Sequence, residues 1–204
     1  MPASAVPRLA ITGSPRPPGI RPRAARLAAG IVAFATLLAG ACPALAQGPA
    51  LDDSAVKAAF VYNFALFTEW PESALPKAAK LRLCIAGGPG EFADALRALA
   101  QKAPARGHEI ETRAVAAPAE AAECHILVAT HPERGLALVR SVRSRPVLTI
   151  GDAPAVAAAG GIIRLFVEAD RVRFEINTDA ADRASIRFSS QLLRLARLVK
   201  DAAP

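Results

Sequence analysis

The sequence is poor in the residues that most often carry out chemistry. Its 204 residues include three cysteines, three histidines, one tryptophan, one tyrosine and one methionine. The histidines His108, His125 and His131 lack the spacing of a zinc site, and the chain has no G-x-S-x-G motif and no Walker phosphate loop. We therefore predict no metal, no cofactor and no catalytic residues, and we expect a protein that is not an enzyme.

Acidic residues are missing from the first 46 positions, which hold five arginines. An apolar run, Leu27–Leu38, follows the arginines, and Ala44–Ala46 (ALA) has the small-x-small pattern of a signal peptidase site. We predict a cleaved signal peptide over residues 1–46 and a domain over 47–204 that is exported to the periplasm. Two alternatives stay open: an uncut anchor, and a lipoprotein at Cys42, which lacks the usual leucine three residues before it.

A strong charge is also missing once the leader is removed. The whole sequence has a net charge of +7 and a pI of about 10.0. The exported part keeps 20 basic and 18 acidic residues, which leaves a net charge of +2. We therefore expect no nucleic-acid partner. After the leader, the sequence contains no apolar run long enough to span a bilayer.

Aromatic residues are scarce, but half of the ten fall within Val56–Pro71. The spacing predicts a helix that begins near Asp52–Ser54 and ends at Trp70, before the proline. It carries two apolar stripes, one formed by Val56, Phe60, Phe64 and Phe67 and the other by Tyr62, Leu66 and Trp70. Such a helix is either enclosed in a core or contacts a partner with one face, and both alternatives stay open.

Short apolar strands alternate with helical stretches beyond residue 80. The predicted strands are 81–86, 109–115, 124–129, 146–150, 162–168 and 171–177, and the predicted helices are 91–102, 117–123, 132–142, 153–159, 180–185 and 191–199. Ala169 and Asp170 form a two-residue turn between the last two strands. We predict an α/β fold: a three-layer sandwich with a mixed, mostly parallel sheet and a late β-hairpin.

Only two cysteines, Cys84 and Cys124, remain after the leader. An even number of cysteines in an exported chain is typical of a disulfide, which would stabilise the fold by about 4 kcal/mol through loop closure. Both lie in apolar, strand-like segments, so two unpaired core thiols are the alternative.

Gly87–Gly90 (GGPG) follows a predicted strand and precedes a predicted helix, where a phosphate loop would lie. Because the phosphate-binding motifs are missing, an ordinary turn is the favoured interpretation. A small ligand there remains open, since the strand ends near Thr130 and Gly151 would lie at the same edge of the sheet. Glu175 alternates with two arginines along its predicted strand, which indicates cross-strand ion pairs.

An ordered set of segments resembles the YfiR family. The segments are Lys57–Pro71, Leu83–Ile85, Cys124–Leu127, Val147–Asp152, Gly160–Phe166, Val172–Asn177 and Ser189–Leu193. The resemblance implies a periplasmic, often dimeric α/β protein that is not an enzyme and that has a disulfide between Cys84 and Cys124. The second disulfide of some members, near residues 157–164, is excluded because this chain has no cysteine there.

The resemblance further implies a regulatory partner. Its best-known members repress an inner-membrane diguanylate cyclase by binding the periplasmic sensor domain, which lowers cyclic-di-GMP and limits biofilm formation. Our first hypothesis is such a regulator, paired with that sensor protein or with a second copy of itself. Its partner-binding candidates are Phe60, Tyr62, Phe67, Trp70, Leu192 and Leu195.

The alternative hypothesis is a periplasmic small-ligand-binding protein without a cyclase partner. Its site would use the loop Gly87–Gly90 and the strand ends near Thr130 and Gly151. A pocket of a few hundred cubic ångströms at that edge would favour it.

Overall fold

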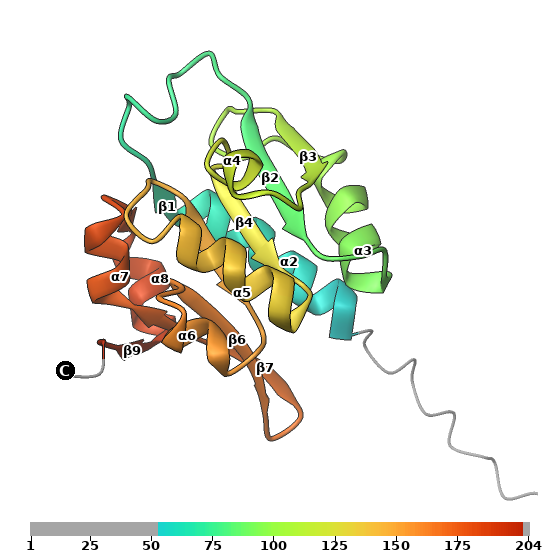
Figure 1. The fold of residues 1–204 in the computed structure, drawn as a ribbon, viewed down its shortest axis with the longest axis vertical. Coiled ribbons are helices and arrows are strands. Elements are labelled where there is room, and N and C mark those ends of the chain that lie inside the picture. Colours follow the sequence, from blue (N-terminus) through green and yellow to red (C-terminus); the bar gives the residue numbers. More distant parts are fainter. Residues whose placement is uncertain (1–52, 202–204) are drawn as a thin grey trace, which may run out of the picture. The chain divides into compact units, whose positions relative to one another are not determined.

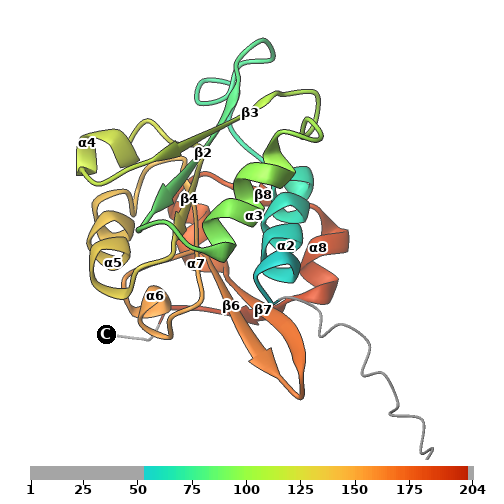
Figure 2. The ribbon, with the colours of Figure 1, turned by 90° about the vertical axis from the view of Figure 1, so that its right-hand side faces the viewer.

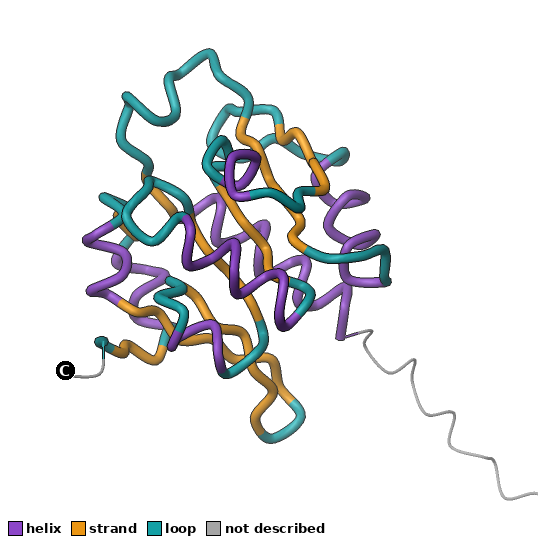
Figure 3. The backbone as a smooth tube through the Cα atoms, viewed as in Figure 1, coloured by secondary structure: helices purple, strands orange, loops and turns teal. Residues whose placement is uncertain are grey.

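The structure, a computed structural model, describes residues 53–201 (Figure 1). Helices and strands alternate along most of this part of the chain (Figure 3). The predicted signal peptide and Cys42 lie outside the described residues.

One seven-stranded sheet runs through the middle of the fold. In spatial order its strands are β3 (Ile110–Ala114), β2 (Leu81–Ala86), β4 (Ile126–Ala129), β5 (Leu148–Gly151), β6 (Ile163–Glu168), β7 (Arg171–Asn177) and β9 (Arg197–Val199). Only β6 and β7 pair antiparallel, and all other neighbours in this sheet are parallel. The predicted mixed, mostly parallel sheet is therefore confirmed.

Helices cover both faces of the sheet, so the predicted three-layer arrangement is also confirmed (Figure 2). One face carries α2 (Asp53–Phe67), α3 (Glu91–Ala100) and α8 (Ser190–Leu195), and the other carries α4 (Pro118–Ala121), α5 (Pro132–Ser141) and α6 (Ala155–Ala158). The six-residue helix α7 (Thr178–Arg183) directly follows β7.

Two apolar clusters fill the space on the two sides of the sheet. Leu83 and Ile85 of β2 pack in the cluster that contains Phe64 of α2, whereas the intervening Cys84 packs in the cluster that contains Leu138 of α5. This split follows from the two-residue period of a strand, which sends alternate side chains to opposite faces. The unbroken apolar runs in the sequence thus reflect strands that are buried on both faces.

The late β-hairpin joins β6 to β7 and extends away from the rest of the sheet (Figure 1). Its two turn residues, Ala169 and Asp170, have φ angles of 49° and 56°. Two successive left-handed residues are the signature of a tight turn whose twist matches that of the strands. The two-residue turn predicted from the sequence is confirmed.

Helix α2 ends at Phe67, three residues earlier than predicted. The Thr68 hydroxyl donates a hydrogen bond to the Phe64 carbonyl at 2.6 Å, which satisfies one of the acceptors left free at the helix end. The chain then forms β1 (Thr68–Glu69), which pairs antiparallel with β8 (Arg187–Phe188) in a separate two-stranded sheet. Strand pairing, rather than Pro71, therefore terminates the helix.

The predicted helix 191–199 is wrong in its second half. Helix α8 ends at Leu195, and Ala196 has extended backbone angles (φ −87°, ψ 149°). The following residues form β9, which pairs parallel with β7 at the edge of the large sheet. The open edge of β7 therefore outweighs the helical spacing of the leucines.

Candidate functional site

The aromatic stripe of α2 is largely part of the core. Phe64 is fully buried, and its ring centroid lies 4.9 Å from that of Phe174 on β7. Phe60, one turn earlier, is half-buried and contacts both rings, with centroid distances of 6.0 Å to Phe64 and 5.8 Å to Phe174. Phe60 therefore offers a partner only its outer edge.

The other two aromatic candidates within α2 are also half-buried. The Tyr62 hydroxyl donates a hydrogen bond to the Pro104 carbonyl at 3.1 Å, in the loop that follows α3. Phe67 packs against the first apolar cluster, and its carbonyl accepts a hydrogen bond from the Ser189 amide at 2.9 Å. Both residues link α2 to neighbouring segments of the chain.

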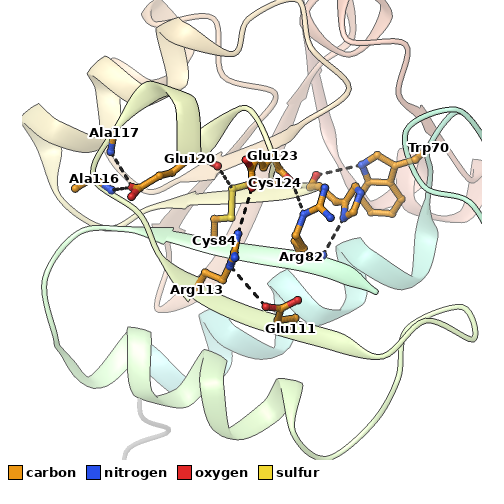
Figure 4. Close-up of a disulfide and its surroundings, with 11 residues drawn as sticks. Trp70, Arg82, Cys84, Glu111, Arg113, Ala116, Ala117, Glu120, Glu123 and Cys124 are labelled. Carbon is orange, nitrogen blue, oxygen red and sulfur yellow. Dashed lines mark hydrogen bonds and ion pairs between the residues drawn. A yellow bond between two sulfur atoms is a disulfide. The ribbon is translucent and has the colours of Figure 1, made fainter. Parts of the chain in front are cut away.

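Trp70 holds the loop after β1 against the sheet. Its indole Nε1 donates a hydrogen bond to the His125 carbonyl at 3.1 Å (Figure 4). The ring is half-buried, and it lies with Glu69 in the walls of two surface hollows of about 400 and 520 Å³. Trp70 thus combines a structural contact with an accessible aromatic surface.

His125 is the most completely buried histidine of the described chain, at 3% exposure. Its Nδ1 accepts a hydrogen bond from the Arg82 amide at 2.8 Å, so Nε2 carries the proton and donates to the Ala74 carbonyl at 3.1 Å. Burial lowers the pKa of the His125 imidazole below its ordinary value of 6.5. This histidine is a neutral structural element.

The two C-terminal candidates, Leu192 and Leu195, differ in burial although both lie on α8. Leu192 is only 4% exposed and belongs to the core, which removes it from any surface. Leu195 is 74% exposed, and Leu198 of β9 is 54% exposed. These two leucines, which we call the C-terminal leucine pair, are the most exposed large apolar side chains of the described residues. The sequence pattern missed Leu198 because it placed that residue within a helix.

The carboxyl ends of β2, β4 and β5 surround a cavity of about 440 Å³, which we call the strand-end cavity. Its walls include the loop residues Gly88, Pro89 and Gly90, together with Thr130 and Asp152. Two other expected residues do not line it, because Gly87 packs against the Thr130 side chain and Gly151 against Val156. The pocket that the alternative hypothesis anticipated at this edge is present.

The three histidines do not come together. His108 Nδ1 contacts the Ala79 carbonyl at 2.7 Å, His125 is buried under Trp70, and His131 precedes α5. Within residues 53–201 there is no group of three or more histidine, cysteine or acidic side chains that could hold a metal ion. In the same range no helix is long and apolar enough to cross a bilayer.

The chain matches the model of a known protein family. A model described as YfiR/HmsC-like matches residues 54–197, which is nearly all of the described chain. The chain belongs to the YfiR/HmsC-like family.

Two solved structures resemble this YfiR/HmsC-like chain at low identity. A conserved domain protein from Vibrio cholerae is 13% identical with a TM-score of 0.47, and the match covers 72% of this chain and 60% of that one. An ABC domain from Streptococcus pneumonia, solved in complex with L-Trp, is 17% identical with a TM-score of 0.43, covering 63% and 57%. The chain thus spans less than two thirds of either protein.

The disulfide expected of a YfiR-like chain is present. Cys84 on β2 and Cys124, just before β4, are bonded across neighbouring strands with a Cα–Cα distance of 5.9 Å (Figure 4). Both cysteines are buried in the second apolar cluster. Beside them, the Glu120 carboxylate accepts hydrogen bonds from the Ala116 and Ala117 amides, which lower its pKa. The disulfide therefore links the segment that follows α4 to strand β2 in the sheet.

Proposed function

We propose that this protein is an exported repressor that binds the periplasmic sensor domain of an inner-membrane diguanylate cyclase. The family match over residues 54–197 is the observation that carries the proposal. The basic, apolar and small-x-small leader in residues 1–46 supports export.

The C-terminal leucine pair is the surface that fits such a partner best. Leu195 ends α8, Leu198 lies three residues later on the edge strand β9, and both are more than half exposed. Burying a leucine side chain fully stabilises a protein or a complex by about 1.5–3 kcal/mol relative to leaving it exposed. The domain on its own lacks this stabilisation at Leu195 and Leu198. The half-buried ring of Trp70, between its two hollows, is a second candidate contact, although its bond to His125 makes it a poor position for a test.

The decisive test is a pull-down from solubilised inner membranes with tagged protein purified from the periplasm. We expect mass spectrometry to identify a membrane protein with a periplasmic sensor domain and a cytoplasmic cyclase domain. The double variant Leu195→Ser, Leu198→Ser should lose this partner. Val167→Ser is the matched control, because Val167 is 52% exposed but lies beside the turn of the β6–β7 hairpin.

A cellular measurement tests the direction of the effect. Deleting the gene should raise intracellular cyclic-di-GMP, and the wild-type chain should restore the lower level, whereas the double leucine variant should not. Unchanged cyclic-di-GMP on deletion, together with recovery of soluble proteins only in the pull-down, would contradict the repressor proposal.

We further propose that the protein forms a homodimer, as family resemblance implies. Sedimentation of the periplasmic protein should give twice the mass of one chain. If the double leucine variant sediments as a monomer, the leucine pair serves the second copy; if it remains dimeric but loses the membrane protein, the pair serves the sensor.

A further inference from the structure

The strand-end cavity lies where the winding of the sheet reverses. The strands β2 and β4 are neighbours, yet their connections diverge: α3 follows β2 on the face that carries α2, and α5 follows β4 on the opposite face (Figure 2). Diverging connections leave a crevice between the two loops at the carboxyl ends of the strands. In open α/β sheets this crevice is the general place for ligands.

The cavity is large enough for a small molecule. Its volume of about 440 Å³ falls within the range of about 300–1,000 Å³ that is typical of ligand pockets. Its walls come from α2, from the two diverging loops and from the end of β5; the lining residues are Ser54, Lys57, Gly88–Ala93, Thr130, His131 and Asp152.

Backbone donors line one wall. The start of α3 is formed by Gly90, which has no side chain, and the structure shows no side-chain cap on this helix. The amides of Glu91, Phe92 and Ala93 are in the first turn, where no carbonyl within the helix accepts their hydrogen bonds. Amides in this position bind oxyanions, aided by the positive end of the helix dipole.

Lys57 is the only lysine or arginine among the residues that line the cavity. Its ammonium group pairs with the Asp152 carboxylate at 2.9 Å, and its side chain keeps 20% exposure. The pair joins α2 to the end of β5 across the cavity. An oxyanion in the cavity would compete with Asp152 for this ammonium group.

His131 is a further polar residue in the lining of the cavity. It precedes α5 and lines the cavity, while its Nδ1 is buried and has no hydrogen-bond partner among the described residues. A buried polar atom without a partner is uncommon in native proteins.

The glycine loop approaches Thr130 closely at one position and borders open space at two others. A side chain at Gly87 would collide with Thr130, so the two loops touch at their base. Beyond that contact, a Cβ placed at Gly88 or Gly90 would meet nothing within 4 Å. The glycines thus combine close approach at the base with free space at the mouth.

We infer that the strand-end cavity binds a small molecule through a single carboxylate or phosphate group, held by the first-turn amides of α3 and by Lys57. Glu91 and Asp152 also line the cavity, which gives two carboxylates to one lysine, and this net negative lining disfavours polyphosphates and nucleic acids. The site is independent of the C-terminal leucine pair, and the inference stands whether or not the proposed repressor role holds.

The test is a titration of the isotope-labelled periplasmic protein, followed by the backbone amide resonances. Sodium acetate and inorganic phosphate are the probes, and sodium chloride at matched ionic strength is the control. We expect saturable shifts of the Glu91–Ala93 amides at millimolar probe concentrations. The probe that saturates at the lower concentration identifies the head group.

Two variants separate binding from a merely structural ion pair. Lys57→Met should weaken probe binding by about tenfold, the range of one charge-assisted hydrogen bond. Asp152→Asn should tighten it severalfold, because it releases Lys57 from its competitor. Shifts that match those with chloride, or an equal loss of binding in both variants, would overturn the inference.

Discussion

At the scale of single residues, we expect a buried ion pair to contribute more to the free energy of unfolding than an exposed one. The clearest comparison lies on the hairpin strands, where Glu175 is buried and Glu168 is exposed. Arg164 holds Glu175 with two hydrogen bonds, at 2.6 and 3.0 Å, and the carboxylate in turn raises the pKa of this arginine. Arg197 holds Glu168 at 2.9 Å, and both guanidinium groups lie over the Phe166 ring.

Glu175→Gln should therefore lower the free energy of unfolding by about 1–3 kcal/mol, because it leaves a partly buried guanidinium group without its charge partner. Glu168→Gln is the matched control and should cost less than about 0.5 kcal/mol, since solvent screens an exposed pair. Urea unfolding of the two variants measures both values, and equal losses would contradict the role of burial.

The buried imidazole of His125 should make the free energy of unfolding depend on pH. Because burial lowers its folded pKa, the unfolded chain binds a proton more readily than the folded chain below the ordinary value of 6.5. The contribution of His125 is complete above that pH and decreases as the pH falls through it. Urea unfolding at pH 7.5 and pH 5 should show this decrease in the wild type, and His125→Gln should show less of it.

At the scale of elements, we expect the close packing of α5 against β4 to outweigh helix propensity in deciding how a substitution at Gly135 changes stability. A Cβ added at Gly135 would lie 2.7 Å from the Ala129 Cβ and 3.2 Å from its Cα, which belongs to the rigid strand. Helix propensity alone predicts that Gly135→Ala stabilises the protein by about 1 kcal/mol. We expect the opposite, a loss of about 1–3 kcal/mol from overpacking.

The exposed position Ala137 in the same helix provides the control. Ala137→Gly should cost about 1 kcal/mol through propensity alone. Thermal unfolding in which Gly135→Ala raises the melting temperature would show that α5 moves away from the sheet at little cost.

The balance between local and long-range interactions also explains which parts of the fold could be predicted from the sequence and which could not. The alternating strands and the hairpin turn were predictable, because periodicity and turn chemistry are local. The residues alone left the pairing of Cys84 and Cys124 open, and the family resemblance implied it. The ends of α2 and α8 were not, because β1 and β9 form only through pairing with β8 and β7. The C-terminal leucine pair was half-missed for this reason, whereas the strand-end cavity was foreseen from the order of loop and strand ends.

At the scale of the whole molecule, the disulfide is the main covalent constraint. It closes a segment of 40 residues that contains α3 and β3. Replacing both cysteines by serine should lower the free energy of unfolding by about 4 kcal/mol on the loop-entropy model. Urea unfolding of this variant measures the loss, and wild-type protein under reducing conditions should behave in the same way.

The C-terminal end of the chain completes the sheet. Asp201 accepts a hydrogen bond from the Asn177 amide group at 2.8 Å and pairs with Arg183, directly after β9 covers the edge of β7. A chain trimmed before residue 197 would expose three residues of β7, Glu175–Asn177, as a free strand edge, the kind of surface that recruits strands from other molecules. Proteolysis that removes β9 should therefore promote self-association of the domain through this edge, so that β9 protects the protein against aggregation.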